Sequence, residues 1–431
     1  MRHLPIDAAL FVENRARLAK LLPPRSVAVV NANDIQPTNA DGTRLPVANS
    51  DLFYLSGIEQ EESILVLAPD APDEKLREVL FVRESSDLLK VWEGYKLTKE
   101  DATRTSGIAA VKWLSDFRTV FRQLMCDADE VFLNTNEHKR AVVEVESRDA
   151  RFIDECRRQY PLHTYRRLAP LLHRLRVVKS DAELALLREA IRITDEGFRR
   201  VCRFVKPGVT EYQIEAEYAH EYVRNRATFA YPPIIACGGN GCVLHYNAND
   251  QTCKPGEMLL MDVAASYANY NADLTRTIPV DGRFAPRQRA VYDAVLRVMR
   301  ASIAGAVVGK LHKDWTKESQ LMMNEELLAL GLITADDLKN AKPDEPACRK
   351  YFMHGLGHPL GLDVHDVGPT SLEPFAPGWV LTVEPGIYLP DEGFGVRLEN
   401  NIVVTEKGPI DLMADIPVDA EAIEDLMRGG R

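Results

Sequence analysis

Five side chains of metal-ligand type place the strongest constraint on the fold, because a metal site requires them to converge. They occur in apolar or glycine-containing segments: Asp262 in LLMDVAASY, Asp273 in NADLTRT, His358 in HGLGHPLGLDVHD, Glu384 in LTVEPGIY and Glu399 in GVRLENN. Four carboxylates and one imidazole form a hard, oxygen-rich donor set that suits divalent ions. Carboxylates that bridge two such ions leave room for water. The pattern predicts a two-metal hydrolytic site.

The two aspartates are expected to face each other across a hairpin. Segments 257–265 and 272–280 have strand character, and a turn near Tyr267–Ala268 would bring Asp262 opposite Asp273. Two facing carboxylates repel each other unless a cation lies between them. A lone aspartate in a strand is usually just exposed, but two aspartates in apolar runs favour metal ligation.

The histidine segment is also informative, because His354, His358 and His365 follow each other closely in a chain with only ten histidines. Its glycines and Pro359 exclude a helix interior. A strand is expected over 350–360, in which residues 354 and 358 share one face. The alternative is a glycine-rich surface loop with incidental histidines.

Glu384 is expected at the tip of a strand over 379–384, because Pro385–Gly386 terminates it. Arg397 and Glu399 are two residues apart in a strand predicted over 395–405, so both point to one face. A substrate-orienting role is favoured for Arg397, and a salt bridge is the alternative. His245, in CVLHYNAN, is on local evidence more often structural than catalytic.

The chain of 431 residues is expected to form two domains. Residues 1–172 alternate strand and helix patterns, which predicts an α/β domain. Residues 173–431 mix strands with helices, which predicts α+β. Helices are expected to start at the capping boxes Ser180–Glu183 and Thr210–Gln213, and at Pro286.

Composition excludes several classes of protein. A net charge of −11 argues against a nucleic-acid partner, which would require a concentrated basic surface. No apolar run is long enough to span a membrane, and Asp7 and Glu13 interrupt any N-terminal signal segment. Seven cysteines without a CxxC pair predict free thiols and a reducing cytoplasm, although Cys237 and Cys242 could lie close together.

A family resemblance emerges from the motifs taken together. HYNAN, MDVAASYANYNADLTRT, HGLGHPLGLDVHD, TVEPGIY and VRLEN resemble the motif set of the pita-bread metallopeptidases, in particular those of the aminopeptidase P and prolidase type. The match runs in order through most of residues 180–405. NSDLFYLSGIEQEESILVL and VWEGYKL resemble the N-terminal accessory domain of the same enzymes. The resemblance implies a pita-bread catalytic domain over 173–431 and a smaller accessory α/β domain over 1–172.

The resemblance also implies residue roles. Two divalent ions would bind each subunit, with Asp262 on one ion, Asp273 and Glu399 bridging both, and His358 and Glu384 on the second. Glu384 would also manage the proton of the bridging water. The remaining implied positions, which bind substrate or stabilise charge, are His245, His354, His365, Arg397, Tyr388 and, at the pocket mouth, Trp92.

The expected activity is therefore hydrolysis of the N-terminal Xaa-Pro bond of proline-containing peptides by a metal-bridging hydroxide. Mn²⁺ is the expected ion, with Co²⁺, Fe²⁺ or Zn²⁺ as substitutes. The rival activity is that of an Xaa-Pro dipeptidase, which acts only on dipeptides. The same fold could also serve a non-catalytic peptide- or protein-binding pseudoenzyme or a creatine-type amidinohydrolase. The resemblance further implies a homodimer or homotetramer. The short segment between Glu384 and Glu399 departs from some relatives and puts loop contacts to longer substrates in doubt.

Overall fold

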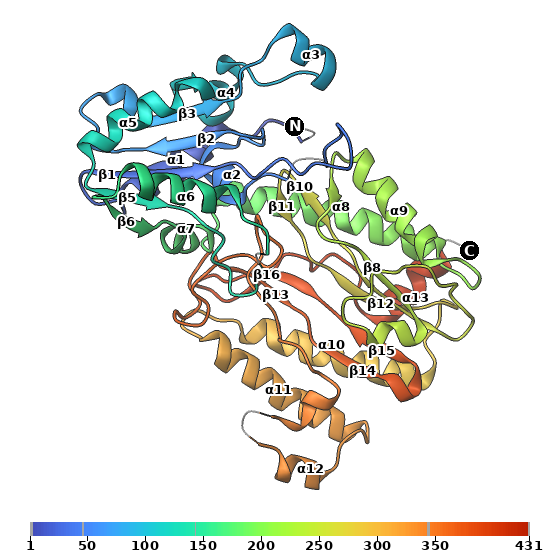
Figure 1. Ribbon diagram of the computed structural model, residues 1–431. Helices are drawn as coiled ribbons and strands as arrows, with labels where there is room; N and C mark the ends of the chain where they lie inside the picture. Colours follow the sequence, from blue (N-terminus) through green and yellow to red (C-terminus); the bar gives the residue numbers. More distant parts are fainter. Residues whose placement is uncertain (1–2, 45–46, 143, 343–344, 430–431) are drawn as a thin grey trace. The chain divides into compact units, whose positions relative to one another are not determined.

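The chain divides into two compact units, one extending to Arg176 and the other beginning at Val177. The computed structural model describes residues 3–44, 47–142, 144–342 and 345–429 (Figure 1). The expected domain boundary at 172 falls inside helix α7 (Ala169–Arg176), and the division comes at the end of that helix.

The N-terminal unit is built on a six-stranded mixed sheet in the order β4-β3-β2-β1-β5-β6. Strand β2 runs antiparallel to both of its neighbours, whereas β1, β5 and β6 are mutually parallel, as are β3 and β4. The strands are β1 (Ser26–Asn31), β2 (Ile64–Leu67), β3 (Glu78–Val82), β4 (Ala110–Trp113), β5 (Glu130–Leu133) and β6 (Thr164–Arg167). Strands β1, β2, β3 and β5 consist mostly of apolar residues, whereas β4 and β6 carry charged residues and lack such runs.

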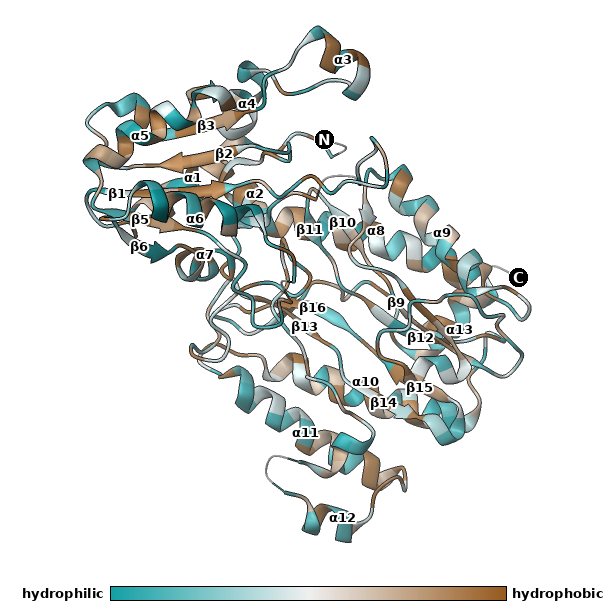
Figure 2. Cartoon of the chain, in the orientation of Figure 1, coloured by the Kyte–Doolittle hydropathy of each residue, from teal (hydrophilic) through white to brown (hydrophobic). Residues whose placement is uncertain are grey.

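Helices cover this sheet, and all residues of β1 are buried. On one face, Phe117 and Phe121 of α5 pack against Phe152 of α6, with ring centroids 5.9 and 5.6 Å apart. Figure 2 shows the strands of this unit as mostly hydrophobic. The helices are α1 (Ala8–Ala19), α2 (Ser50–Ser56), α3 (Asp87–Glu93), α4 (Lys99–Ser106), α5 (Phe117–Asp127), α6 (Arg148–Gln159) and α7, with 3₁₀ turns η1 (Glu74–Leu76) and η2 (Leu114–Asp116).

The C-terminal unit contains small antiparallel sheets in the orders β12-β9-β8, β11-β10-β7, β13-β16-β17 and β14-β15. The strands are β7 (Thr228–Phe229), β8 (Ile234–Cys237), β9 (Met258–Asp262), β10 (Ala265–Tyr267), β11 (Tyr270–Asn271), β12 (Thr275–Pro279), β13 (Val380–Val383), β14 (Gly386–Leu389), β15 (Phe394–Arg397), β16 (Asn400–Val403) and β17 (Ile410–Asp411).

The helices of this unit pack against those strands from different sides. Helices α8 and α9 contact β7, β8, β10 and β11, whereas α10 contacts β13, β14 and β15 (Figure 1). The helices are α8 (Asp181–Phe204), α9 (Glu211–Arg224), α10 (Pro286–Gly305), α11 (His312–Ala329), α12 (Ala335–Asn340) and α13 (Ala420–Arg428), with 3₁₀ turns η3 (Gly238–Cys242), η4 (Ala347–Lys350) and η5 (Pro390–Glu392).

Local sequence signals determine the starts of three of these helices. Ser180 and Glu183 form the predicted capping box of α8, with the Ser180 N–H donating to Glu183 Oε2 at 2.9 Å. The Thr210 N–H donates to Gln213 Oε1 at 3.0 Å where α9 begins. Pro286 lies in the first turn of α10. These predictions are confirmed.

The predicted turn near Tyr267–Ala268 is confirmed, but the predicted register is wrong. Tyr267 pairs with Tyr270, and Ala268 and Asn269 have left-handed φ angles of 52° and 63°. Asp262 lies opposite Thr275 instead of Asp273. The reason is that the chain changes sheet between β11 and β12, so Asp273 lies in the gap between two ladders.

The strand expected over 350–360 is wrong as well. The chain leaves η4 without forming a strand, and the structure has only an isolated bridge between Pro359 and Leu381. Backbone bonds to β13 are present, from the Leu360 N–H to the Val380 carbonyl and from the Thr382 N–H to the His358 carbonyl. The His358 N–H, however, donates to the side-chain Oγ1 of Thr382 at 3.0 Å instead of to a backbone carbonyl, which interrupts the ladder.

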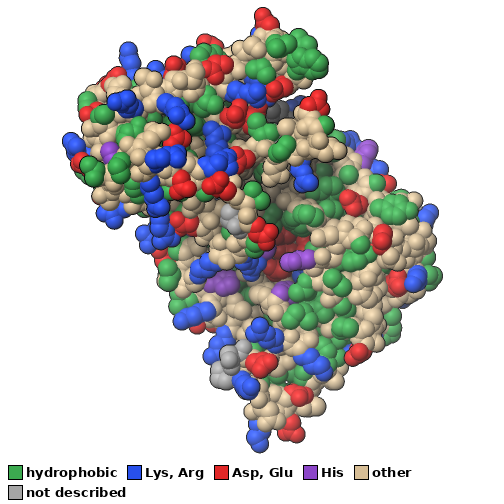
Figure 3. Space-filling model, in the orientation of Figure 1, with side chains coloured by type: hydrophobic (Ala, Val, Ile, Leu, Met, Phe, Trp, Pro, Cys, Tyr) green, Lys and Arg blue, Asp and Glu red, His purple; other side chains and the backbone are tan. Residues whose placement is uncertain are grey.

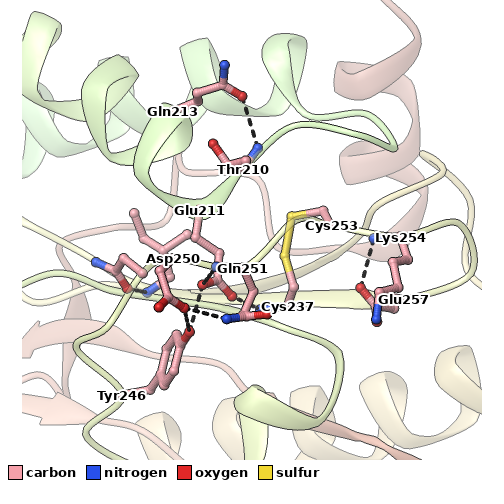
Figure 4. The surroundings of a disulfide bond; sticks show 12 residues. Thr210, Glu211, Gln213, Cys237, Tyr246, Asp250, Gln251, Cys253, Lys254 and Glu257 are labelled. Carbon is pink, nitrogen blue, oxygen red and sulfur yellow. Dashed lines mark hydrogen bonds between the residues drawn. A yellow bond between two sulfur atoms is a disulfide. The ribbon is translucent and has the colours of Figure 1, made fainter.

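The prediction that all seven cysteines are free thiols is wrong for two of them. Cys237 and Cys253 form a disulfide, with Cα atoms 5.5 Å apart (Figure 4). The end of β8 and the segment before β9 meet beside the start of α9, where the Cys253 N–H donates to the Val209 carbonyl at 2.9 Å. The sequence could not reveal this long-range approach. Cys242 stays free, so the suggested approach of Cys237 and Cys242 does not produce a bond.

The surface carries charges of both signs, and Lys and Arg side chains are interspersed with Asp and Glu on the visible face (Figure 3). Within the described ranges, no helix combines the length and apolar character needed to cross a bilayer.

One carboxylate of the N-terminal unit makes stability depend on pH. Asp149 lies in the first turn of α6, where its Oδ1 accepts a hydrogen bond from Asn31 Nδ2 at 2.8 Å. Burial, which outweighs the hydrogen bond from Asn31, raises the pKa of Asp149 from 3.8 to about 6. Because the folded pKa is raised, the contribution of this group to stability is lost as pH rises from 3.8 through about 6.

We expect Asp149→Asn to stabilise the N-terminal unit by about 1 kcal/mol above neutral pH, since a pKa unit corresponds to about 1.4 kcal/mol and partial exposure weakens the effect. Near the unfolded pKa the variant and the wild type should be equally stable. Urea unfolding across pH measures this difference. Asp154→Asn, at an exposed position of the same helix, is the control. A stability difference that does not change with pH would contradict the assignment.

Candidate metal centre

The predicted ligands lie where strands of the C-terminal unit begin or end. Asp262 is the last residue of β9, Glu384 directly follows β13, and Glu399 directly precedes β16. Asp273 lies in the gap before β12, and His358 lies alongside β13, with its carbonyl accepting from the Thr382 N–H at 2.9 Å. These positions let side chains leave the hydrogen-bonded ladders and point toward a shared centre.

Three of these side chains form a compact group. Ligand atoms of Asp273, His358 and Glu399 all lie within 4.8 Å of one another. His358 Nε2 is 3.5 Å from Asp273 Oδ2 and also 3.5 Å from Glu384 Oε1, which adds Glu384 to the group. Figure 3 shows acidic side chains recessed between histidines on the visible face of the molecule.

Tyr231 connects the fifth predicted ligand to this group. Its hydroxyl lies 2.6 Å from Asp262 Oδ1 and 2.7 Å from Asp273 Oδ1. All five predicted ligands therefore belong to one connected cluster, although their roles as ligands stay a prediction. Sequence analysis missed Tyr231, because a tyrosine before Pro232–Pro233 carries no sign of proximity to two distant aspartates.

Asp273 is also held through its backbone by Asn401, a second residue that sequence analysis missed. The Asp273 N–H donates to Asn401 Oδ1 at 3.0 Å, and Asn401 Nδ2 donates to the Asp273 carbonyl at 2.7 Å. Asn401 lies two residues after Glu399, so the alternation used for Arg397 and Glu399 could have placed it near the site.

The cluster fits divalent cations on electrostatic grounds. Glu399 is 1% exposed, and although its Oε2 accepts from Thr275 Oγ1 at 2.7 Å, its Oε1 is buried without a hydrogen-bond partner. Such an oxygen is costly unless a cation or donor compensates it. Burial, followed by repulsion from neighbouring carboxylates, raises the pKa values of Asp273 and Glu399 well above their ordinary range. A cation would remove this penalty and keep both groups ionised.

Arg397 forms an ion pair, but with a different partner from the one its sequence neighbour suggested. Its guanidinium donates to Asp262 Oδ2 at 2.7 Å and to the Tyr388 hydroxyl at 2.9 Å. Burial opposes the charge, yet Tyr388 and Asp262 raise the pKa of Arg397 above its usual value. The guanidinium therefore stays charged and orients Asp262. Its substrate-orienting role stays a prediction.

His354 is held in one neutral tautomer. Its Nδ1 donates to the Gly355 carbonyl at 2.8 Å, which leaves Nε2 to accept from the Tyr388 hydroxyl at 2.7 Å. Burial, reinforced by the charge of Arg397, lowers the pKa of His354 to about 3. Nδ1 lies 3.9 Å from Glu384 Oε2, so the ring borders the cluster.

The other predicted substrate-binding residues are more exposed. The His365 ring centroid lies 4.2 Å from that of His358. His245 is exposed, and it contributes to lowering the pKa of His354, which places it in the same neighbourhood. Trp92 belongs to α3 of the N-terminal unit, is 79% exposed, and is not part of this cluster within the C-terminal unit.

Comparison with known proteins assigns the chain to a family. Residues 185–406 match metallopeptidase family M24, and residues 11–132 match the aminopeptidase P N-terminal domain. The chain belongs to metallopeptidase family M24.

Related proteins support this assignment over the whole chain. The Xaa-Pro aminopeptidase of Escherichia coli is 34% identical, with 98% of each chain covered. Zinc-substituted aminopeptidase P of E. coli in complex with product superposes with a TM-score of 0.86 at 33% identity, covering 99% of this chain and 100% of that one. Aminopeptidase PepP of Pseudomonas aeruginosa superposes with a TM-score of 0.89 at 30% identity, covering 100% and 99%. The predicted pita-bread fold with its smaller N-terminal domain, and the predicted class of metallopeptidase, are confirmed.

Tyr231→Phe should weaken metal binding, because it removes the hydroxyl shared by Asp262 and Asp273. We expect metal affinity to fall roughly 10-fold, as is common when a group supporting metal ligands is removed. Competition with a chromogenic chelator measures the affinity. Tyr212→Phe, which alters a tyrosine 57% exposed on the neighbouring helix α9, should leave it unchanged. Equal affinities for the Tyr231 variant and the wild type would contradict this role.

Gly357→Ala should displace His358. A Cβ at Gly357 would lie 2.0 Å from the Thr382 carbonyl oxygen, so the segment carrying His358 would have to move away from β13. We expect a loss of at least about 2 kcal/mol in unfolding free energy together with reduced metal content. Gly355→Ala is the matched control, because nothing lies within 4 Å of its Cβ position. If both variants retain wild-type stability and metal content, the segment is not constrained as described.

Proposed function

We propose that this protein is a two-metal Xaa-Pro aminopeptidase, which removes the N-terminal residue of peptides whose second residue is proline. The observation that carries the proposal is one connected cluster of four carboxylates and one imidazole, in which Oε1 of Glu399 is buried without a hydrogen-bond partner. Relatives named Xaa-Pro aminopeptidase, matching over nearly the whole chain, support the substrate class.

The proposed metal assignment follows the family resemblance. Asp262 would hold one ion, His358 and Glu384 would hold the second, and Asp273 and Glu399 would be shared between the two. The 3.5 Å distances from His358 to Asp273 and Glu384 support a common ion for these groups. The oxygen-rich donor set favours Mn²⁺, and Co²⁺, Fe²⁺ and Zn²⁺ are compatible with it.

Bound divalent cations would lower the pKa of water and polarise the scissile carbonyl. Glu384 accepts the proton of the attacking water and returns it to the departing proline nitrogen. His365 and His245 donate hydrogen bonds to the carbonyl oxygen as it becomes negative, a contribution of about 3 kcal/mol. Arg397 and Tyr388 hold Asp262 and His354 in place. Because proline has no N–H, the site selects it by the shape and fixed φ of its ring.

Several further assignments belong to the same proposal. The N-terminal residues to about 172 serve as the accessory domain. The protein forms a homodimer or homotetramer, and Trp92 lines the mouth of a substrate pocket. A cytoplasmic location belongs to the same proposal.

A pair of peptides with the same Xaa-Pro start, one a dipeptide and one a tripeptide, tests the activity. We expect Mn²⁺-loaded protein to release the N-terminal residue from the tripeptide, and chelation to abolish this release. Release from the dipeptide alone would identify an Xaa-Pro dipeptidase. No cleavage of either peptide by fully metal-loaded protein would favour the non-catalytic binding protein. Glu384→Gln is the inactive control, since it lacks the proton-accepting carboxylate.

A further inference from the structure

The segment that carries His245 has no regular structure beyond its first turn. It leaves β8 at Cys237, passes through η3 and reaches β9 only at Met258. His245 lies in its middle and is exposed. A loop of this kind can place an imidazole accurately only if other parts of the molecule hold it. We call residues 238–251 the His245 loop.

Glu211, in the first turn of α9, contacts the residue just before this loop, its middle and its last residue. Its side chain is fully buried, with 0% exposure. Oε1 accepts from the Cys237 N–H at 2.8 Å, and Oε2 accepts from the Gln251 N–H at 2.9 Å. Oε2 also accepts from the hydroxyl of Tyr246, the residue next to His245, at 2.8 Å (Figure 4).

The backbone strengthens the same junction. The Glu211 N–H donates to the Gln251 carbonyl at 2.9 Å, so the main chain and the side chain of one residue both bind Gln251. The disulfide between Cys237 and Cys253 closes the loop over a sequence separation of 16. The ends of the loop are therefore held both by hydrogen bonds to Glu211 and by the disulfide. In the middle of the loop, the Tyr246 hydroxyl hydrogen-bonds to Glu211 and, at 3.4 Å, to Asp250.

The chemistry requires a carboxylate at this position. The donors directed at Glu211 are two backbone N–H groups and one hydroxyl, and an ionised carboxylate can accept from all of them with charge-assisted hydrogen bonds. A glutamine would direct its own N–H group at one of these donors. An alanine would leave buried N–H groups without an acceptor.

We propose that Glu211 is a positioning residue, whose carboxylate holds the His245 loop so that His245 faces the reacting peptide. This inference rests on the proposed function, because it gives His245 a role in binding the substrate. In the described part of the chain, the hydrogen bonds of the Glu211 carboxylate go to Cys237, Tyr246 and Gln251 and not to the metal-ligand cluster, so we expect it to act through the loop.

A double-mutant cycle with His245→Ala tests the inference. Glu211→Gln should lower kcat/KM for the tripeptide roughly 100-fold, which is typical of a displaced positioning group, with metal content unchanged. In the His245→Ala background, the same substitution should have no further effect, because the group that it positions is already absent. An equal loss in both backgrounds would overturn the proposal in favour of a general structural role.

Two further variants keep the test decisive. Tyr246→Phe removes a single donor, should fold normally, and should reduce kcat/KM in the same direction but less; wild-type kinetics for this variant would overturn the role of the Tyr246 contact. Glu217 lies elsewhere on α9, and its carboxylate pairs with Arg200 of α8. Glu217→Gln should behave as wild type. A loss of kcat/KM in Glu217→Gln equal to that in Glu211→Gln would overturn the proposal, because it would trace the effect to helix α9 in general.

Hydrogen–deuterium exchange separates this inference from the proposed function. Glu211→Gln should accelerate exchange of the amides in 238–251 while leaving those of α10 unchanged. If wild-type protein cleaves neither peptide, the proposed function fails, and accelerated exchange would still support the anchoring of the loop. Unchanged exchange in 238–251 would overturn the anchoring whatever the activity.

Discussion

The structure of the catalytic unit depends on bringing like charges together in a largely buried cluster. Asp273 and Glu399 are buried beside other carboxylates, and burial raises the pKa values of both. The surrounding protein compensates only part of this cost, through Tyr231, Thr275 and the guanidinium of Arg397. Because the rest of this cost is not compensated, the cluster attracts divalent cations strongly. The affinity for metal and the cost of folding are therefore two aspects of the same arrangement.

A second set of contacts keeps the surrounding side chains in defined protonation states. Arg397, Tyr388 and His354 form a continuous chain of hydrogen bonds that starts at Asp262. Because His354 is neutral and its Nδ1 hydrogen is used by Gly355, the ring cannot exchange protons freely with Glu384. In the proposed mechanism, the proton that moves during hydrolysis is thereby left to Glu384.

Sequence signals predicted those features that depend on a few neighbouring residues. The capping box at Ser180, the first-turn proline of α10 and the turn after Tyr267 all rest on local chemistry, and the structure contains them. The position of Glu384 at a strand tip follows equally from Pro385–Gly386. Acidic residues in apolar runs are unusual and marked the carboxylates as candidate ligands, whereas the closely spaced histidines marked His358.

Features that depend on long-range approach could not be predicted. The register that pairs Asp262 with Thr275 depends on where the chain changes sheet. The disulfide depends on the meeting of two segments beside α9, and Tyr231 gains its importance from two aspartates that lie far away in sequence. Around His358, glycines and Pro359 remove the alternation that would distinguish an extended segment from a strand.

The placement of the ligands at the ends of separate small sheets has a mechanical consequence. Sheets of two or three strands depend for their stability on packing against other elements. Ions held jointly by Asp262, Glu384 and Glu399 would cross-link the β12-β9-β8 and β13-β16-β17 sheets. Loading with metal should therefore stiffen the scaffold as a whole, so that the ions serve architecture as well as chemistry.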